Sequence, residues 1–84
     1  MLDVEARQAM DVKDVLSSDP EVVSGAVVFK GTRVPVDALF EHLAAGDTIE
    51  VFLGDFPTVE RSQVETVLRL AAIDLKRIFE KKAA

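Results

Sequence analysis

The sequence predicts a mainly α-helical fold with a small N-terminal β-hairpin, followed by three helices in the helix-turn-helix order, the last of them long. Three observations lead to this prediction. The run from Lys30 to Gly46 changes from extended residues to an amphipathic helix at one point. A tight turn over residues 55–58 separates two later helical patterns, and an apolar stripe continues from Glu60 to Lys82. The chain is accordingly divided into an N-terminal arm (1–11), a β-hairpin element (12–36) and a helix-turn-helix domain (37–82).

The 84 residues form one small domain whose core leaves little surplus stability, so we expect a homodimer or another protein partner. The hydrophobic content of 49% supports a packed core. The lack of cysteine excludes disulfides and thiolate metal sites, and His42 has no second imidazole with which to share a metal, so we expect neither metal nor cofactor. No apolar run approaches the ~20 residues of a membrane span and no signal-peptide order is present, which predicts a cytoplasmic protein that uses no membrane.

The net charge of −5 is unevenly distributed along the chain. Residues 1–59 hold four basic and eleven acidic side chains, a balance of −7, whereas residues 60–84 hold six basic and four acidic ones, a balance of +2. An acidic chain argues against strong non-specific binding of nucleic acid, yet a locally basic helix can dock when two copies present it together. Charge therefore leaves nucleic-acid binding open.

The N-terminal part of the chain predicts one hairpin. Residues 1–11 fit either a short helix or a loose arm. The apolar residues between Val12 and Leu16 can start a strand, Ser17 to Pro20 has turn chemistry, and Ala26 to Phe29 is a short β-branched strand. A two-stranded ribbon is marginal by itself, so it must lie against the helices or pair with the same ribbon of another chain.

The first helix is predicted to begin after Pro35, which lacks an amide hydrogen and holds the preceding residue in an extended conformation. Asp37 is a candidate N-cap, and Gly46 is expected to end the helix. His42 lies off the apolar face, so we expect it in solvent. The buried face expected from the spacing consists of Val36, Leu39, Phe40, Leu43 and Ala44.

Two further helices are predicted from their caps and apolar faces. Asp47 and Glu50 fit a capping box before the second helix, and residues 55–57 end it. The expected apolar face of the second helix consists of Ile49, Phe52, Leu53 and Phe56. The expected stripe of the long third helix consists of Val64, Val67, Leu68, Ala71, Leu75, Ile78 and Phe79.

The long helix is apolar on more than one side, because Leu70 and Ile73 lie off that stripe. Such a helix suits a second contact surface better than it suits solvent. We therefore expect Leu70, Ile73 and Arg77 at an interface with a partner or a second copy.

The start of the long helix is a candidate DNA-binding surface, because the later helix of a helix-turn-helix offers its first turns to the major groove. Five side chains there can donate to bases or phosphates, namely Arg61, Ser62, Gln63, Thr66 and Arg69. The alternative is an ordinary exposed helix face, on which Glu60 and Glu65 repel phosphates. The pattern leaves both interpretations open.

The turn before the first helix also has two interpretations. Its residues are Gly31, Thr32, Arg33 and Pro35. A guanidinium on a glycine-containing turn can grip a carboxylate or a phosphate with two hydrogen bonds. Alternatively, Arg33 pairs with Asp37, Glu41 or the 19–21 loop and fastens the hairpin to the first helix, which the acidic surroundings favour. No triad, paired-carboxylate site or phosphate-binding loop is visible in the sequence, so we expect no catalytic residues and no enzyme.

Five blocks of the sequence occur in an order that is specific as a set. They are Asp19-Pro20-Glu21-Val22, Gly31-Thr32-Arg33-Val34-Pro35-Val36, Ala45-Gly46, Phe56-Pro57 and the helix face of Val64, Val67 and Leu68. From Leu16 to Ala72, the chain resembles the bacterial and archaeal DUF433 family of unknown function, whose members are described as predicted antitoxin components of toxin–antitoxin systems. The resemblance implies a β-element before a homeodomain-like helix-turn-helix. It also implies an antitoxin that binds a PIN-like ribonuclease toxin and its own operator DNA.

The chain departs from the family pattern at two places. Ser24-Gly25-Ala26-Val27 stands where members usually have Gly-Gly-Lys-Pro, and Glu60-Arg61-Ser62-Gln63 replaces a Thr-Pro-Glu-Asp-like helix start. The second departure removes a good cap but makes the recognition helix less acidic, which favours nucleic acid slightly. Two hypotheses follow: an antitoxin that also binds operator DNA, and a protein-interaction module that never contacts DNA.

Overall fold

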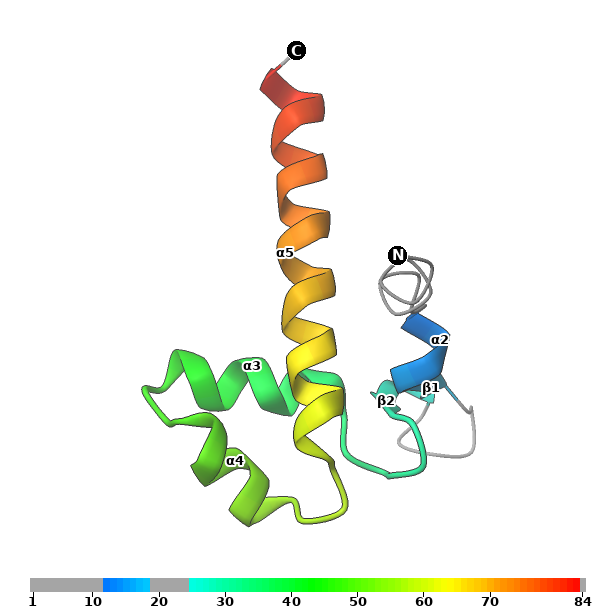
Figure 1. Ribbon diagram of the computed structural model, residues 1–84, viewed down its shortest axis with the longest axis vertical. Helices are drawn as coiled ribbons and strands as arrows, with labels where there is room; N and C mark the ends of the chain where they lie inside the picture. Colours follow the sequence, from blue (N-terminus) through cyan, green and yellow to red (C-terminus); the bar gives the residue numbers. More distant parts are fainter. Residues whose placement is uncertain (1–11, 19–24, 84) are drawn as a thin grey trace, which may run out of the picture.

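The computed structural model describes residues 12–18 and 25–83 (Figure 1). The predicted fold class is confirmed: the chain is mainly helical, with one antiparallel hairpin near the N-terminus and a long C-terminal helix. The predicted arm and the residues Asp19 and Pro20 of the predicted turn lie outside the described residues. The elements are α2 (Val12–Val15), β1 (Leu16–Ser18), β2 (Val27–Phe29), α3 (Val36–Ala44), α4 (Ile49–Asp55) and α5 (Arg61–Ala83).

The hairpin pairs Leu16 of β1 with Phe29 of β2 in antiparallel register. The predicted strand start at Val12 is wrong, because Val12 to Val15 form the helical turn α2, which brings Val15 into the core. Ser17 and Ser18 belong to β1 and not to a turn. The Lys30 amide donates to the Val15 carbonyl at 2.8 Å, so α2 and the end of β2 are fixed to each other.

The core joins the hairpin to the three later helices. Its fully buried members are Phe29, Leu39, Phe52 and Val64, which come from β2, α3, α4 and α5. The rings of Phe29 and Phe52 lie 5.9 Å apart between centroids, within the range of a favourable aromatic pair. The ribbon therefore lies against the helices of its own chain, which is the first of the two arrangements expected from the sequence.

Helix α3 differs from its prediction at its start and agrees at its end. Its N-cap is Pro35, with no side-chain hydrogen bond, so Asp37 is not the cap and instead occupies the first turn, where a carboxylate suits the helix dipole. Leu39 is fully buried, whereas Phe40 and Ala44 are exposed, so the buried face is narrower than predicted.

Gly46 ends α3, as predicted. It adopts a φ of 95°, a left-handed conformation that glycine accepts without a steric cost. The Gly46 amide donates to the Leu43 carbonyl at 3.0 Å and the Asp47 amide donates to the His42 carbonyl at 2.9 Å, the two bonds of a Schellman motif. The chain consequently reverses direction at a defined point before α4.

Helix α4 is capped by Thr48 and not by the predicted Asp47. The Thr48 hydroxyl accepts from the Val51 amide at 3.2 Å. The helix ends at Asp55, as predicted, and the turn that follows brings Val59 into the core.

Helix α5 confirms the long helix predicted from the stripe. Its 23 residues span about 35 Å, close to the longest extent of the molecule, 37 Å. Val64 and Val67 are buried, but burial decreases along the helix, and its C-terminal half extends away from α3 and α4 (Figure 1). Within the described ranges, neither α5 nor any other helix is both long and apolar enough to cross a membrane.

Candidate functional site

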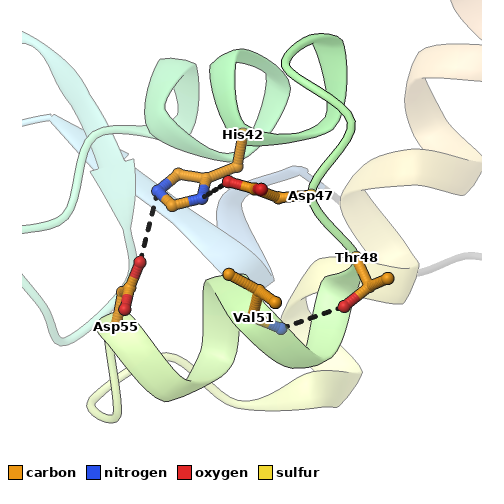
Figure 2. Close-up of polar contacts among 5 residues, drawn as sticks. All are labelled: His42, Asp47, Thr48, Val51 and Asp55. Carbon is orange, nitrogen blue, oxygen red and sulfur yellow. Dashed lines mark hydrogen bonds and ion pairs between the residues drawn. The ribbon is translucent and has the colours of Figure 1, made fainter.

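His42 is the centre of a polar cluster between α3 and α4 and is not the solvated side chain that the sequence predicts. Its Nδ1 donates to an Asp47 carboxylate oxygen at 2.9 Å, and its Nε2 lies 3.8 Å from Asp55 (Figure 2). The imidazole also contacts Phe52 and Phe56 in edge-to-face geometry, with centroids 5.5 and 5.7 Å away. Only 21% of the His42 side chain is exposed. The cluster therefore fastens α3, the loop and α4 together.

The turn before α3 is held by its own hydrogen bonds. Gly31 has a φ of 81°, and the Thr32 hydroxyl donates to the Phe29 carbonyl at 2.9 Å and accepts from the Val34 amide at 3.0 Å. Pro35 forms an isolated antiparallel bridge with Val28. These contacts give the turn a structural role in closing the hairpin onto α3.

Arg33 is exposed and makes no ion pair with Asp37 or Glu41, two of the three partners considered for it. The third, the 19–21 loop, lies outside the described residues. Arg33 therefore presents its guanidinium to solvent on the part of the surface that the structure describes.

Arg61, the first residue of α5, is engaged with α4. Its guanidinium donates to a Glu50 carboxylate oxygen at 2.7 Å. The Arg61 hydrogen bond lowers the pKa of Glu50 below its ordinary value, and the Glu50 backbone and the Arg61 charge lower it further. Both side chains are largely exposed, so the pair orients Arg61 more than it stabilises the fold.

Gln63 caps α5 and is not free to contact bases. Its carbonyl oxygen accepts from the Glu60 amide at 2.9 Å, and its amide nitrogen donates to the Lys30 carbonyl at 3.0 Å. The first bond satisfies the Glu60 amide at a helix start that has no Ser, Thr, Asp or Asn as N-cap. The second bond connects α5 to the end of the hairpin. Thr66 is half-buried and already has an interaction partner. Of the five candidate DNA contacts, Ser62 and Arg69 are exposed and make no such contact with residues 12–18 or 25–83.

Titration of Glu50 tests the contact with Arg61. Because the pKa of Glu50 is lowered in the folded chain, the small stabilisation is present above the ordinary pKa and is lost as the pH falls through the lowered one. Replacing Arg61 by Ala should raise the pKa of Glu50 towards its ordinary value in an NMR titration of the side-chain carboxyl carbon. Arg69→Ala is the matched control, since Arg69 makes no ion pair with Glu50. An unchanged pKa in Arg61→Ala would show that the pair does not form in solution.

The three predicted interface residues of α5 line one open groove. Leu70, Ile73 and Arg77 face elements far away in the sequence across a space of about 410 Å³. The opposite walls come from α2, β1 and α3. The other lining residues are Val12, Leu16, Val36, Phe40, Val67, Ala71 and Asp74. We refer to this feature as the α2/α3/α5 groove.

The groove is apolar and partly open to solvent. Val12, Phe40 and Ile73 are each between 39% and 48% exposed, although all three are large apolar side chains. Leu70 is half-buried and packs against the core, so it forms the floor of the groove and not its rim. Asp74 and Arg77 supply one charge of each sign. The groove can therefore hold an apolar segment and orient it by charge.

A second apolar surface lies further along α5. Leu75 and Phe79 are 66% and 71% exposed, and Ile78 is nearly half exposed. These residues continue the stripe that Val64 and Val67 begin, but no part of the described chain covers them. In the described ranges, no three His, Cys, Asp or Glu side chains are grouped so as to hold a metal ion.

Comparison with known proteins gives three similarities. Residues 16–71 match the family described as "Protein of unknown function (DUF433)". The chain is 33% identical over 61 residues to the uncharacterized protein y4eO of Sinorhizobium fredii (strain NBRC 101917 / NGR234), which covers 73% of this chain and 26% of that protein. The chain thus spans about a quarter of the length of this curated relative.

The third similarity is to a solved structure. A crystal structure of a DUF433 member protein from Anabaena variabilis ATCC 29413 matches with a TM-score of 0.63 and 17% sequence identity. The match covers 99% of this chain and 82% of that chain. At this level of identity, the likeness concerns the fold alone.

Proposed function

The chain belongs to the DUF433 family of proteins of unknown function, and we propose that it is a cytoplasmic antitoxin whose α2/α3/α5 groove binds a toxin of the PIN-like ribonuclease kind. The observation that carries the proposal is the cluster of exposed apolar side chains in the groove, above all Ile73 and Phe40. Contiguous exposed apolar surface on a small domain is typical of a protein-binding site. The antitoxin role itself comes from the family resemblance.

The groove favours an apolar partner segment with a matching charge. Three separate elements supply its walls, so a bound segment would contact α2, α3 and α5 at once. Arg77 can form a two-bonded contact with a carboxylate of the partner, because its guanidinium presents a planar fork of donors. Binding would remove Ile73 and Phe40 from water, which contributes about 25 cal/mol for each Å² of apolar surface that is buried.

The test uses the purified product of the neighbouring gene, which the proposal requires to be a ribonuclease, and measures its binding and inhibition by this chain. The wild-type chain should bind the ribonuclease and suppress its cleavage of RNA. The double variant Ile73→Lys/Arg77→Glu should bind at least about 100-fold more weakly, because it puts a cation among the apolar side chains and reverses the orienting charge. Leu70 is left intact because it packs against the core.

The control for this experiment is Lys76→Glu, an exposed change on the same turns of α5 outside the groove. It should inhibit like the wild-type chain. Equal inhibition by the groove variant, or no binding by the wild-type chain, would contradict the proposal.

Operator DNA is a second candidate ligand, favoured by the exposed Ser62 and Arg69 at the start of α5. In this arrangement Arg61 would read a base, with its orientation set by Glu50, and Arg69 would contact the backbone. Gln63, which caps the helix, would position α5 and not read a base. The exposed Glu65 opposes phosphate binding, so the proposal ranks behind the protein-binding one.

DNA binding predicts different effects for the two arginines. Arg61→Ala should lose about 1 to 3 kcal/mol and relax sequence preference, whereas Arg69→Ala should weaken all sequences alike and reduce the salt slope by about one. Fluorescence anisotropy with the upstream region of the gene, at two salt concentrations and with and without the toxin, measures both effects. No sequence preference in either state would leave the protein-binding role alone.

A further inference from the structure

We propose that α5 pairs in antiparallel orientation with α5 of a second copy of this chain, through the exposed turns after Ala71. The inference does not depend on the proposed toxin. It starts from the apolar surface formed by Leu75, Ile78 and Phe79, which the described part of the chain leaves uncovered.

The spacing along α5 is that of a helix-pairing seam. Leu68, Ala71, Leu75, Ile78 and Lys82 follow one another in steps of three and four residues. This alternation is the heptad pattern, which keeps one seam facing a neighbouring helix. Leu68 and Ala71 are half-buried by the chain's own core, whereas Leu75 and Ile78 continue the same seam into solvent. Beyond the core of the domain, α5 therefore presents an apolar seam on which a second helix can pack.

The side chains beside the seam select the antiparallel orientation. A two-fold axis between Leu75 and Ile78 places Leu75 opposite Ile78 of the partner subunit, and Ile78 opposite Leu75 of the partner subunit. The same axis brings Asp74 close to Lys81 of the partner subunit. The two residues lie on the same side of the seam and are offset along the helix axis by about two residues, ~3 Å. Neither Asp74 nor Lys81 makes an ion pair among the described residues of one chain. The pairing would thus form two equivalent ion pairs of opposite charges.

The other side of the seam has complementary shapes. The same axis places the large ring of Phe79 beside the small side chain of Ala72 of the partner subunit, and both residues are exposed in one chain. A parallel pair has neither advantage, because it sets Lys82 against Lys82 of the partner subunit and Asp74 beside the ring of Phe79. Charge and shape therefore favour one orientation.

The seam and the groove are neighbouring surfaces of α5. In a helix with 3.6 residues per turn, Ile73 and Leu75 point about 160° apart, whereas Ala71 and Asp74 lie at the border that the groove and the seam share. Ile73 therefore stays outside the seam in the dimer. Since the exposed part of the seam, Leu75 to Lys82, covers only about one heptad, we expect a weak dimer that dissociates on dilution.

Sedimentation equilibrium over a concentration series tests the pairing. The wild-type chain of 9.2 kDa should approach twice that mass, and Ile78→Lys should weaken association by about 100-fold while circular dichroism remains unchanged. Ile73→Lys, an isoleucine of similar exposure in the groove, is the control and should associate like the wild type. A wild-type chain that stays monomeric up to about 1 mM, or an Ile78→Lys variant that remains dimeric, would overturn the proposal.

Charge exchange tests the orientation. Asp74→Lys and Lys81→Asp each set like charges against each other in an antiparallel pair, so each variant alone should associate about tenfold more weakly. A mixture of the two variants restores both ion pairs and should form the mixed dimer. Dimerisation that neither substitution affects, or a mixture no stronger than its components, would overturn the antiparallel alignment.

Discussion

Replacing Phe52 by Ala is expected to lower the free energy of unfolding by about 3 to 5 kcal/mol, the largest effect of any substitution proposed for this chain. The ring is fully buried and contacts the rings of Phe29, His42 and Phe56, so its removal leaves a cavity at the point where β2, α3 and α4 meet. The free energy of unfolding of small domains is about 5 to 15 kcal/mol in total. The variant should therefore be partly unfolded at low urea concentrations.

Urea denaturation followed by circular dichroism measures this effect. Phe79→Ala is the matched control, because it makes the same change at a phenylalanine of α5 that is 71% exposed, and it should leave the midpoint unchanged when the chain is dilute enough to be monomeric. Equal midpoints for Phe52→Ala and the wild type would contradict the core described for this fold.

Replacing His42 by Ala should destabilise the chain by about 2 to 4 kcal/mol, the second largest effect. The variant loses two edge-to-face ring contacts, with Phe52 and Phe56, and the hydrogen bond to Asp47. An edge-to-face contact is worth about 0.5 to 1.5 kcal/mol and a hydrogen bond about 1 kcal/mol.

Glu41→Ala is the control for His42, since Glu41 is the exposed neighbour on the same helix. Thermal and urea unfolding should separate the two variants clearly. If His42→Ala were as stable as Glu41→Ala, the imidazole would be a solvated side chain after all, as the sequence alone suggests.

Local signals made the C-terminal ends of α3 and α4 and the long helix predictable. Gly46 stops α3 because its left-handed conformation is a property of the residue itself, and the stripe of α5 is continuous enough to specify a helix without knowledge of its neighbours. Phe29 could likewise be assigned to a strand from its β-branched neighbours.

Contacts between distant segments explain the predictions that failed. His42 lies off the apolar face of α3, but α4 supplies Phe52 and Asp55 to surround it, which a single-helix pattern cannot show. Asp47 accepts from His42 and leaves the cap to Thr48. Helix α2 has only four residues, about one turn, so no helical repeat can be seen in its sequence, and it packs against α5.

The candidate surfaces were predictable to different degrees. Leu70, Ile73 and Arg77 share one side of α5, so helical spacing alone could group them, although the opposite walls of their groove come from α2, β1 and α3. Helical spacing groups Gln63 with the base-reading residues, because it does not reveal the contact of Gln63 with the Lys30 carbonyl, which lies 33 residues away in the sequence. The local signal that could have indicated the structural role of Gln63 is its position three residues after Glu60, from which its side chain can accept from the Glu60 amide.

The isoleucine methyl groups give the most direct test of protein binding in the groove. The chain has three isoleucines: Ile73 lines the groove, Ile78 lies on the exposed seam of α5, and Ile49 packs against the core at the start of α4. A methyl NMR spectrum of isoleucine-labelled protein, titrated with the unlabelled ribonuclease proposed as its partner at constant chain concentration, therefore reports on each location separately. We predict a large shift or broadening of the Ile73 signal, with little change at Ile49 and Ile78. An unchanged Ile73 signal in a complex that saturates would contradict the account.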